Sequence, residues 1–462
     1  IISQNKNNLE ALFLKISNIN LSNNNSNDQI WLLIASSIDR INKQIDFLSR
    51  GLSSIPTPGS WMVEGPFDSS YSLAKLNRHF AEALNTKLLN LFISITEGYG
   101  DYQIDIDYLR KFSLIYSIYL KSKSKSKQID ISSRNLYPPR VKDLDSRINT
   151  LHSYGWEESK LPYAWVNDFN TYLQGITVMS CQVKKILIDS GVNIPIQVSG
   201  LGLDHIDGIK PDFNFELKSR KFKVLHISSC FPRKGVDILL NAFCETFTDQ
   251  DEVCLIIKTF NNPHNDIEKK IDQIRSNNSH IPEIIILNKD MTDEQIKGLL
   301  IQSDVLVAPS RGEGFGFPIG EAMRLGVPVI TTEWGGQLDF CTKENSWLID
   351  YKFVFSKSHF QIFQSYWAEP SQKHLSKLLY EIYSSDKKNL SQRTDRAKKD
   401  TDLFTWDYVA ENNINFVKKE CIRYKSKYFK LGILTTWNSK CGIASYSKNM
   451  FSDISDEFVV FS

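Results

Sequence analysis

The sequence predicts an α/β protein built from two domains, each with a doubly wound parallel sheet. Strand and helix patterns alternate over residues 60–200, and a second alternation of the same kind runs over residues 223–331. A turn rich in Gly, Pro and Ser at residues 64–71 separates a short strand from a helical pattern, which is typical of the opening of such a domain. The length of 462 residues accommodates about three domains.

The composition is that of a globular chain. With 41% hydrophobic and 23% charged residues and a net charge of +2, it excludes a disordered or collagen-like protein and gives no reason to expect nucleic acid. No apolar run reaches the roughly 18 residues of a membrane-spanning helix, and the first residues lack a signal-peptide pattern, so a cytoplasmic location is expected. The seven scattered cysteines contain no C-x-x-C pair and predict buried thiols.

The elements of the first domain follow a Pro/Gly cluster at residues 56–59, which marks a boundary after an amphipathic helix over residues 28–50. The domain opens with a strand at residues 61–63 and a helix whose apolar residues extend to Leu84. Further strands are expected at residues 88–94, 148–152, 175–179 and 194–198. Helical segments separate these strands, which favours a parallel sheet.

The second domain is expected to begin with a strand at residues 223–227. Its other strands are expected at residues 253–258, 283–287, 305–308 and 327–331, and its helices at residues 235–247, 267–276 and 319–325. Helical patterns over residues 373–401 and 406–419 are expected to complete the two α/β domains. A strand-turn-helix-strand order returns at residues 431–461 and predicts the opening of a third Rossmann-like domain, so we expect the natural polypeptide to be longer.

The most informative stretch is the segment from Pro309 to Met323. Three glycines within five residues precede Pro318 at a helix start, and such a helix N-terminus exposes backbone N–H groups that favour an anion. Glu313 in the loop and Glu321 in the first helical turns add carboxylates, which accept hydrogen bonds from sugar hydroxyls. Taken singly, these residues are more often a tight turn and a solvated carboxylate. Together they predict a ligand that contains both sugar and phosphate.

The whole pattern from Ser303 to Ile330 resembles the E-x7-E signature of the retaining GT-B glycosyltransferases of family GT4, or glycosyl transferase group 1. Residues 231–240 resemble the phosphate-binding turn and helix of that family, and residues 65–74 resemble the first loop of its acceptor domain. The resemblance covers about residues 60–420. It implies a GT-B fold, in which two Rossmann-like domains face each other across a cleft, within a fragment of a tandem multi-glycosyltransferase polypeptide.

The resemblance divides the chain into five parts. These are a helical N-terminal extension (residues 1–54), an acceptor domain (55–203), a nucleotide-sugar donor domain (204–402), a C-terminal helix that packs back on the acceptor domain (403–425) and the truncated start of a second glycosyltransferase domain (426–462).

The resemblance also implies roles for individual residues. Glu313 would hold hydroxyls of the donor sugar, Glu321 would bind the ribose, and Arg233 and Lys234 would neutralise the diphosphate. One departure is Ser229, which stands where the family pattern has an arginine, five residues before the lysine. The remaining implied contacts are His152 near the reacting carbon, Gly65 at the diphosphate, Asp68 facing the acceptor, and the amides of Gly314, Phe315, Gly316 and Phe317 on the donor.

The activity implied is transfer of a hexosyl-type sugar with retention, in surface polysaccharide or glycoconjugate synthesis. The resemblance implies no required metal or other cofactor, and the chain has no His/Cys cluster with ligand spacing. The implied partners are a nucleotide-sugar donor, a glycan or lipid-linked acceptor, further transferase domains and the inner face of the membrane as a peripheral contact.

Two other functions are considered besides a glycosyltransferase. A dinucleotide-dependent oxidoreductase is disfavoured, since no predicted strand is followed by G-x-G-x-x-G with an acidic residue about 20 positions later. A catalytically silent GT-B module that binds carbohydrate, or scaffolds a neighbouring transferase, stays open.

Overall fold

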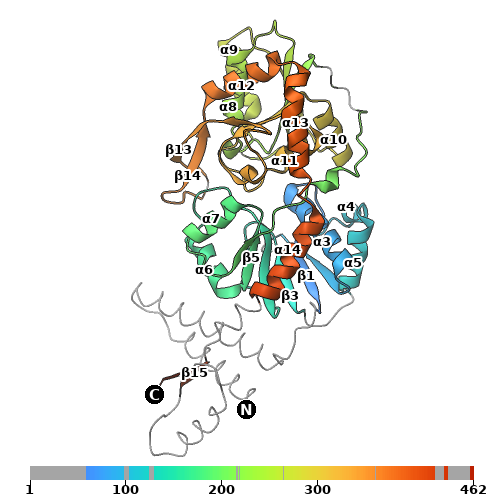
Figure 1. The fold of residues 1–462 in the computed structure, drawn as a ribbon, viewed down its shortest axis with the longest axis vertical. Helices are drawn as coiled ribbons and strands as arrows, with labels where there is room; N and C mark the ends of the chain where they lie inside the picture. Colours follow the sequence, from blue (N-terminus) through green and yellow to red (C-terminus); the bar gives the residue numbers. More distant parts are fainter. Residues whose placement is uncertain are drawn as a thin grey trace, which may run out of the picture. The chain divides into compact units, whose positions relative to one another are not determined.

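The computed structural model describes residues 59–97, 103–123, 129–214, 217, 219–263, 265–358, 360–421, 431–434 and 458–461. The chain divides into two units, one of residues 55–417 and one of residues 1–54 together with residues 418–462. The helices expected over residues 28–50 and 443–453 lie outside the described residues. The larger unit contains two six-stranded sheets, each accompanied by helices (Figure 1).

The first sheet is parallel throughout, with strand order β2-β1-β3-β4-β5-β6. Its strands are β1 (Trp61–Gly65), β2 (Leu91–Ile95), β3 (Ile131–Arg134), β4 (Ile148–Tyr154), β5 (Gly175–Val178) and β6 (Ile196–Val198). The helices of this domain are α3 (Ser72–Lys87), α4 (Ile106–Arg110), α5 (Ser113–Lys123), α6 (Tyr163–Tyr172) and α7 (Cys181–Asp189). The strand order reverses between β1 and β3, and ligands of open α/β sheets bind beyond the carboxyl ends of the strands at such a point.

The second sheet is also parallel, with strand order β12-β11-β10-β7-β8-β9, so its order reverses between β7 and β10. Its strands are β7 (Phe222–Ile227), β8 (Val253–Thr259), β9 (Glu283–Asn288), β10 (Val305–Ala308), β11 (Val329–Thr332) and β12 (Trp347–Ile349). Its helices are α8 (Val236–Thr246), α9 (Ile267–Asn277), α10 (Asp293–Ile301), α11 (Phe317–Leu325), α12 (Gln372–Ser384) and α13 (Lys387–Thr401). The prediction of two doubly wound parallel sheets is therefore confirmed.

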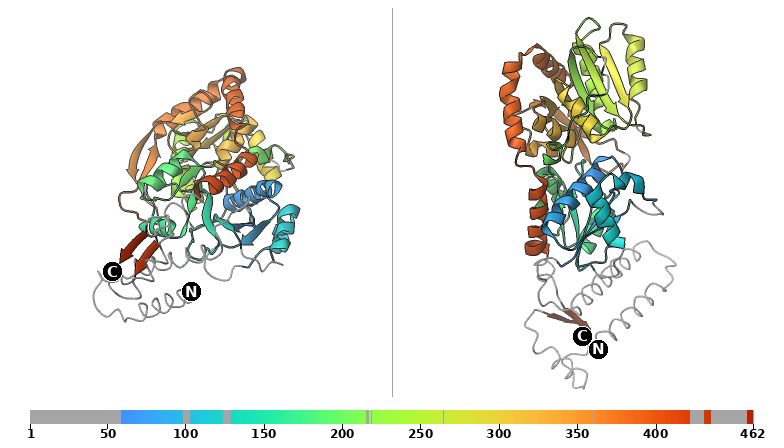
Figure 2. Two further views of the ribbon diagram at one scale, coloured as in Figure 1. Left: turned by 60° about the horizontal axis from the view of Figure 1, so that its bottom comes forward. Right: turned by 90° about the vertical axis from the view of Figure 1, so that its right-hand side faces the viewer.

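The chain passes between the two domains twice. The first passage follows β6, and the second leads from α13 into α14 (Trp406–Phe416), which packs against α3 of the first domain. Figures 1 and 2 show α13 and α14 following one another along the same side of the molecule. The two passages lie side by side, because the amide of Leu203 donates to the carbonyl of Phe404 at 2.8 Å.

An antiparallel hairpin, β13 (Tyr351–Phe355) and β14 (Tyr366–Pro370), belongs to the second domain. The loop between its strands contacts the first domain: the hydroxyls of Ser356 and Ser365 donate to Glu158 Oε2 at 2.9 and 2.8 Å. A second connection between the domains therefore exists away from the two passages of the chain.

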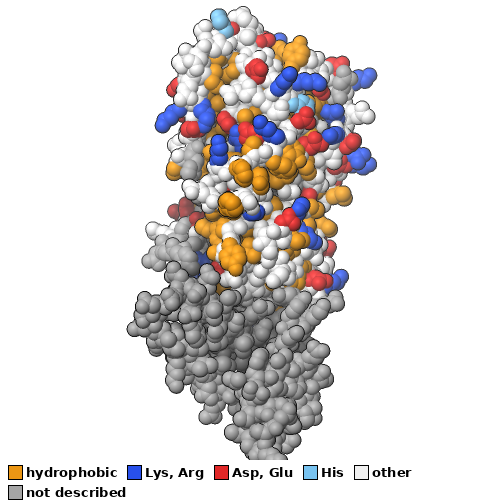
Figure 3. Space-filling model, turned by 90° about the vertical axis from the view of Figure 1, so that its left-hand side faces the viewer, with side chains coloured by type: hydrophobic (Ala, Val, Ile, Leu, Met, Phe, Trp, Pro, Cys, Tyr) orange, Lys and Arg blue, Asp and Glu red, His pale blue; other side chains and the backbone are white. Residues whose placement is uncertain are grey.

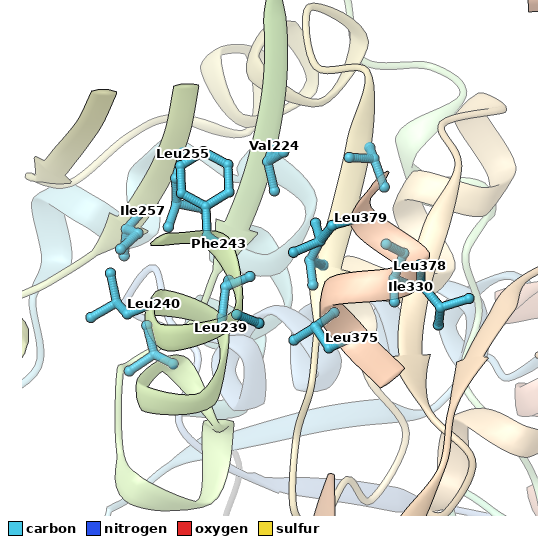
Figure 4. Packing of buried hydrophobic residues seen from close by; sticks show 14 of the residues in the cluster. Val224, Leu239, Leu240, Phe243, Leu255, Ile257, Ile330, Leu375, Leu378 and Leu379 are labelled. Carbon is cyan, nitrogen blue, oxygen red and sulfur yellow. The ribbon is translucent and has the colours of Figure 1, made fainter. Parts of the chain in front are cut away.

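The core of the second domain lies between its sheet and helices α8 and α12. On α8, Leu239, Leu240 and Phe243 recur at the helical period and are fully buried or nearly so. Burial of a side chain of this size contributes about 1.5–3 kcal/mol relative to exposure. Figure 4 shows these three side chains together with those of Val224, Leu255, Ile257, Ile330, Leu375, Leu378 and Leu379.

Two observed features differ from the sequence expectation for physical reasons. The strand β3, Ile-Ser-Ser-Arg, was not predicted because it lacks an apolar run. It is nonetheless buried, since Trp61 Nε1 donates to Ser133 Oγ at 2.8 Å and Arg134 Nε donates to Glu64 Oε2 at 3.1 Å. The continuous helical pattern expected over residues 373–401 forms two helices, because Ser385 adopts an extended conformation between α12 and α13.

Two strands are described in the smaller unit. β15 (Leu431–Leu434) and β16 (Phe458–Phe461) pair in parallel, with Leu431 opposite Phe458. They coincide with the strands that the sequence predicts at the start of a third Rossmann-like domain.

Candidate active site

Two loops meet where the strand order of the second sheet reverses. The turn after β7 contains Arg233 and Lys234 within a single 3-10 turn, and the loop after β10 contains Glu313. Gly235 ends the turn with φ of 67°, and a Cβ atom there would lie 1.9 Å from the carbonyl oxygen of Pro309. Glycine is therefore required for the two loops to approach this closely.

Glu313 is the buried acceptor of this cluster. Its Oε1 accepts hydrogen bonds from Lys234 Nζ at 2.6 Å and Ser310 Oγ at 2.7 Å, while Arg233 Nη1 lies 3.9 Å from Oε2. Burial by itself raises the pKa of Glu313, but the charges of Lys234 and Arg233 outweigh it and hold that pKa below its usual value. Burial also lowers the pKa of Lys234, although Glu313 opposes this shift. The site thus holds an ionised carboxylate beside two cationic side chains.

Arg233 connects the cluster to the first domain. Its Nη1 donates to the carbonyl oxygen of Gly312 at 2.9 Å, and its Nη2 lies 3.2 Å from Glu157 Oε1. Glu157 follows strand β4, so the two domains are in contact beside the cluster. Ser229, where the family pattern has an arginine, supplies a backbone carbonyl that accepts from Asn262 Nδ2 at 2.9 Å.

The amide groups at the start of α11 have a distinct property. Within the described part of the chain, the N–H groups of Gly314, Phe315, Gly316 and Phe317 donate no hydrogen bond to another protein group. The first N–H groups of a helix have no partner within the helix, and their partial positive charge favours an anion. Four consecutive donors therefore follow Glu313 directly along the chain.

Arg311 fixes this loop, and the sequence analysis missed it. Its guanidinium donates to both oxygens of Asp237 on α8, at 2.9 and 2.8 Å, and Nη2 donates to Glu369 Oε1 on β14 at 2.9 Å. It also donates to the carbonyl of Pro232, and its own amide donates to the carbonyl of Arg233 at 2.7 Å. These bonds hold the Glu313 loop against the Arg233–Lys234 turn. No local pattern marks Arg311, since its partners lie 74 and 58 residues away.

Glu321 lies on α11, eight residues after Glu313, and belongs to a second cluster. Its Oε1 accepts from Lys75 Nζ of helix α3 at 3.0 Å and from His205 Nε2 at 2.9 Å. Lys75 Nζ also lies 3.0 Å from Asp293 Oδ1. Burial raises the pKa of Glu321, but Lys75 and His205 reverse the shift and lower it to about 2. Glu321 is therefore ionised at neutral pH, and the sequence analysis did not predict its partners Lys75 and His205.

Gly65 and Asp68 lie just after β1, where the strand order of the first sheet reverses. Gly65 has φ of 149°, and a Cβ atom there would lie 2.2 Å from the carbonyl oxygen of Asn135 and 2.4 Å from Asn77 Nδ2. The strained conformation and the close packing both require glycine. Asp68 is buried, and its Oδ2 accepts from the amide of Asp105 at 2.7 Å. This described bond of Asp68 lies within the first domain.

His152 lies on β4 and is completely buried. Its Nε2 lies 2.9 Å from Asn77 Oδ1, and its ring stacks on Phe80 at 4.4 Å between centroids. Burial lowers the pKa of His152 to about 3, so the ring is neutral at physiological pH. Both contacts are with α3, and none of the hydrogen bonds and ring contacts described for His152 involves Arg233, Lys234 or Glu313.

The structure thus groups the predicted residues in three places. Arg233, Lys234 and Glu313 meet at the second sheet, Glu321 is held beside the passages of the chain, and Gly65, Asp68 and His152 lie in the first domain. No helix of the described residues has both the length and the apolar character needed to cross a membrane. Within the same residues, no three His, Cys, Asp or Glu side chains are placed to hold a metal ion.

Comparison with solved structures defines the fold. Residues of this chain superimpose on Anabaena HepE in complex with UDP and glucose with a TM-score of 0.58 and 15% sequence identity, covering 78% of this chain and 99% of that chain. At this identity the similarity concerns the fold alone. Two parallel six-stranded sheets in this arrangement are the GT-B fold of glycosyltransferases.

Sequence comparisons point to the same group of proteins. Residues 221–353 match the family model described as Glycosyl transferases group 1. An MMP alpha-(1->4)-mannosyltransferase of Mycolicibacterium hassiacum is 30% identical over 162 residues, which are 35% of this chain and 37% of that protein. The O-antigen biosynthesis glycosyltransferase WclY of Escherichia coli is 30% identical over 168 residues, 34% of this chain and 44% of its own length. The chain therefore spans less than half the length of the curated relatives that it matches.

Proposed function

We propose that residues 55–425 form a glycosyltransferase of the GT4 type, which moves a hexosyl sugar from a nucleoside-diphosphate sugar to an acceptor hydroxyl with retention of configuration. One observation carries the proposal: the carboxylate of Glu313 and the cations of Arg233 and Lys234 adjoin the four unbonded amides of residues 314–317. Cations and oriented amides suit a diphosphate, and a carboxylate suits sugar hydroxyls. The family match of residues 221–353 supports this assignment.

In this function, negative charge develops on the leaving diphosphate as the glycosidic C–O bond breaks. Arg233, Lys234 and the N-terminus of α11 stabilise that charge, while Glu313 orients the sugar and Glu321 binds the ribose. Lys234 and Glu313 pair at 2.6 Å, so donor binding exchanges this ion pair for phosphate on the lysine and hydroxyl groups on the carboxylate. Because Arg233 and Lys234 supply the positive charge, we propose that transfer needs no divalent metal and no other cofactor.

His152 contributes differently from the other residues in this proposal. Its neutral ring is bonded to Asn77 through Nε2, whereas Nδ1 has no hydrogen-bond partner among the described residues, so Nδ1 is the ring atom that we propose for the donor sugar. Gly65 and Asp68 would contribute from the first domain, Gly65 by allowing close approach of the diphosphate and Asp68 by facing the acceptor.

We propose that the product is a surface polysaccharide or another glycoconjugate, built on a glycan or lipid-linked acceptor. Relatives described as a mannosyltransferase and as an O-antigen biosynthesis glycosyltransferase support this class of product. The division into acceptor domain, donor domain and returning helix is part of the proposal. So is the start of a second transferase at residues 426–462, where the parallel pair β15–β16 is what a new Rossmann-like domain would begin with.

We propose that the β13–β14 hairpin provides a peripheral contact with an anionic membrane surface. Phe353, Phe355 and Phe363 have 56%, 62% and 82% of their surface exposed. Residues 351–370 contain two lysines and one acidic residue, Glu369, which is paired with Arg311. Aromatic side chains flanked by lysines suit the boundary of an anionic bilayer. Figure 3, seen from the side of this hairpin, shows apolar side chains gathered near the middle of the surface. Failure of the protein to sediment with anionic vesicles at low salt would argue against this contact.

A thermal-shift screen against GDP-, UDP-, ADP- and dTDP-sugars tests the proposed function. A true donor raises the melting temperature by mass action, and the donor that does so should also be hydrolysed slowly or transferred. The alternative is a catalytically silent module that binds carbohydrate or acts as a scaffold. It is supported by Ser229, which stands where the family pattern has an arginine. Stabilisation by a nucleotide sugar with no hydrolysis and no transfer would favour that alternative, and no stabilisation by any of the four would exclude the donor site.

A further inference from the structure

The carboxylate of Glu321 is held on one side only. Both of its hydrogen bonds, from Lys75 Nζ at 3.0 Å and from His205 Nε2 at 2.9 Å, end on Oε1. Within the described residues, Oε2 has no hydrogen-bond partner, although only 5% of the side chain is exposed. One oxygen is therefore saturated by protein donors, and the other retains its accepting capacity.

The orientation of the His205 ring and its tautomer follow from its second neighbour. Trp406 Nε1 lies 3.2 Å from His205 Nδ1, and an indole N–H can only donate. Nδ1 must therefore accept, which places the proton of the neutral ring on Nε2, where it points to Glu321. The ring is also held by packing, since it stacks on His79 at 4.7 Å and meets the edge or face of Phe317 at 5.8 Å.

The groups that hold Glu321 come from elements other than α11. Lys75 belongs to α3 of the first domain, and His205 lies in the short helix Asp204–Ile206 on the first passage between the domains. Trp406, which contacts His205, is the first residue of α14, where the second passage ends. The side chain of Lys75 is only 12% exposed and is held additionally by Asp293, 39% exposed, at 3.0 Å. The orientation of a carboxylate in the donor domain thus depends on three segments that assemble only when both domains are in place.

We propose that Lys75 and His205 are positioning residues, which fix Glu321 so that its Oε2 accepts hydrogen bonds from the vicinal hydroxyls of the ribose of a nucleoside diphosphate. This inference rests on the proposed function, because it assumes that the ligand is a nucleotide. The inference adds one claim to the proposed function. Through Lys75, the first domain contributes to recognition of a ribose that it need not touch. The opposite arrangement, in which Lys75 competes with the ribose for Glu321, predicts the opposite sign when Lys75 is removed.

The test is calorimetric titration of the full chain with UDP, GDP, ADP and dTDP, followed by the tightest of the three ribonucleotides and its 2′,3′-dideoxy counterpart; dTDP itself lacks the 2′-hydroxyl. The variants are Lys75→Met, Lys75→Arg, His205→Phe and Glu321→Gln. The matched control is Lys87→Met on the same helix, because Lys87 pairs with Asp407 at 2.6 Å and Glu411 at 3.1 Å on α14 and makes no described contact with Glu321. Circular dichroism and melting curves verify that each variant folds.

We expect Lys75→Met and His205→Phe each to weaken binding of the ribonucleotide by roughly tenfold, as for hydrogen-bonded partners that orient a metal ligand. They should also reduce the preference for the ribonucleotide over its dideoxy counterpart, which a merely structural defect would leave unchanged. Lys75→Arg should restore most of the affinity and most of the preference for the ribonucleotide. Lys87→Met should match the wild type in both quantities.

Different failures of this test have different meanings. Tighter binding by Lys75→Met would overturn the positioning role in favour of competition. Wild-type affinity and wild-type preference in both Lys75→Met and His205→Phe, with a loss in Glu321→Gln, would overturn the inference and leave the proposed function intact. Absence of binding by the wild type to all four diphosphates would overturn the proposed function, and this inference with it.

Discussion

Replacement of Glu321 by glutamine should change how the stability of the protein depends on pH. The pKa of Glu321 is lowered from 4.5 to about 2 by Lys75 and His205, against the effect of burial. A lowered pKa in the folded state stabilises the protein above the unfolded pKa, and this stability is lost as the pH falls towards the folded pKa. A shift of this size corresponds to about 3 kcal/mol at neutral pH.

The same two pKa values give the size of the effect over an accessible range. At pH 3.5 the contribution of Glu321 has fallen to about 2 kcal/mol, so about 1 kcal/mol is lost between pH 7 and pH 3.5. Glutamine cannot titrate. The free energy of unfolding of the wild type should therefore fall by about 1 kcal/mol more than that of Glu321→Gln over this interval.

Urea unfolding followed by tryptophan fluorescence at pH 7, 5, 4.25 and 3.5 measures this difference. The control is Glu268→Gln, which replaces an exposed carboxylate on α9 and should parallel the wild type at every pH. A gap between wild type and Glu321→Gln that stays constant from pH 7 to pH 3.5 would refute the electrostatic account of the Lys75–Glu321–His205 cluster.

Four further outcomes are expected. Glu313→Ala should lower transfer by about a hundredfold or more, because it removes the carboxylate proposed to hold the donor sugar, and near-normal turnover would contradict that role. Activity should survive EDTA, whereas loss of activity that Mg²⁺ or Mn²⁺ restores would contradict the metal-free proposal. Gly235→Ala should lower both the melting temperature and the affinity for the donor, since its Cβ would lie 1.9 Å from Pro309 O; an unchanged melting curve would count against the steric argument. Phe243→Ala should destabilise the second domain by about 3–5 kcal/mol in urea unfolding, and a loss below about 1 kcal/mol would show that the core relaxes around the site.

Much of the fold follows from local patterns in the sequence, and the exceptions have physical causes. The strands at residues 223–227 and 305–308 were predicted because they are short apolar runs between helices. Strand β3 was not, because it lacks an apolar run, and the bonds of Ser133 to Trp61 and of Arg134 to Glu64 join residues about 70 positions apart in the chain. The order of strands within each sheet is likewise a property of long-range pairing that no local pattern records.

The candidate site divides in the same way. Glu313 and Glu321 were predicted because they stand in a glycine-rich loop and in the helix that follows it. Lys75, His205 and Arg311 carry no local signal, since each is defined by partners from other elements. The expected place of His152 beside the reacting carbon depends on which way its ring points. That direction is set by Asn77 and Phe80, which the sequence does not connect with it.

The bonds of Arg311 have a consequence for how this part of the protein opens. One guanidinium joins the Arg233–Lys234 turn, the first turn of α8, the Glu313 loop and strand β14. Releasing any one of these segments leaves a buried cation with unpaired N–H groups, which is costly, so the four should open together as a single cooperative unit. Their amide hydrogens would then exchange with solvent at a common free energy, although the segments span residues 231–370 of the chain.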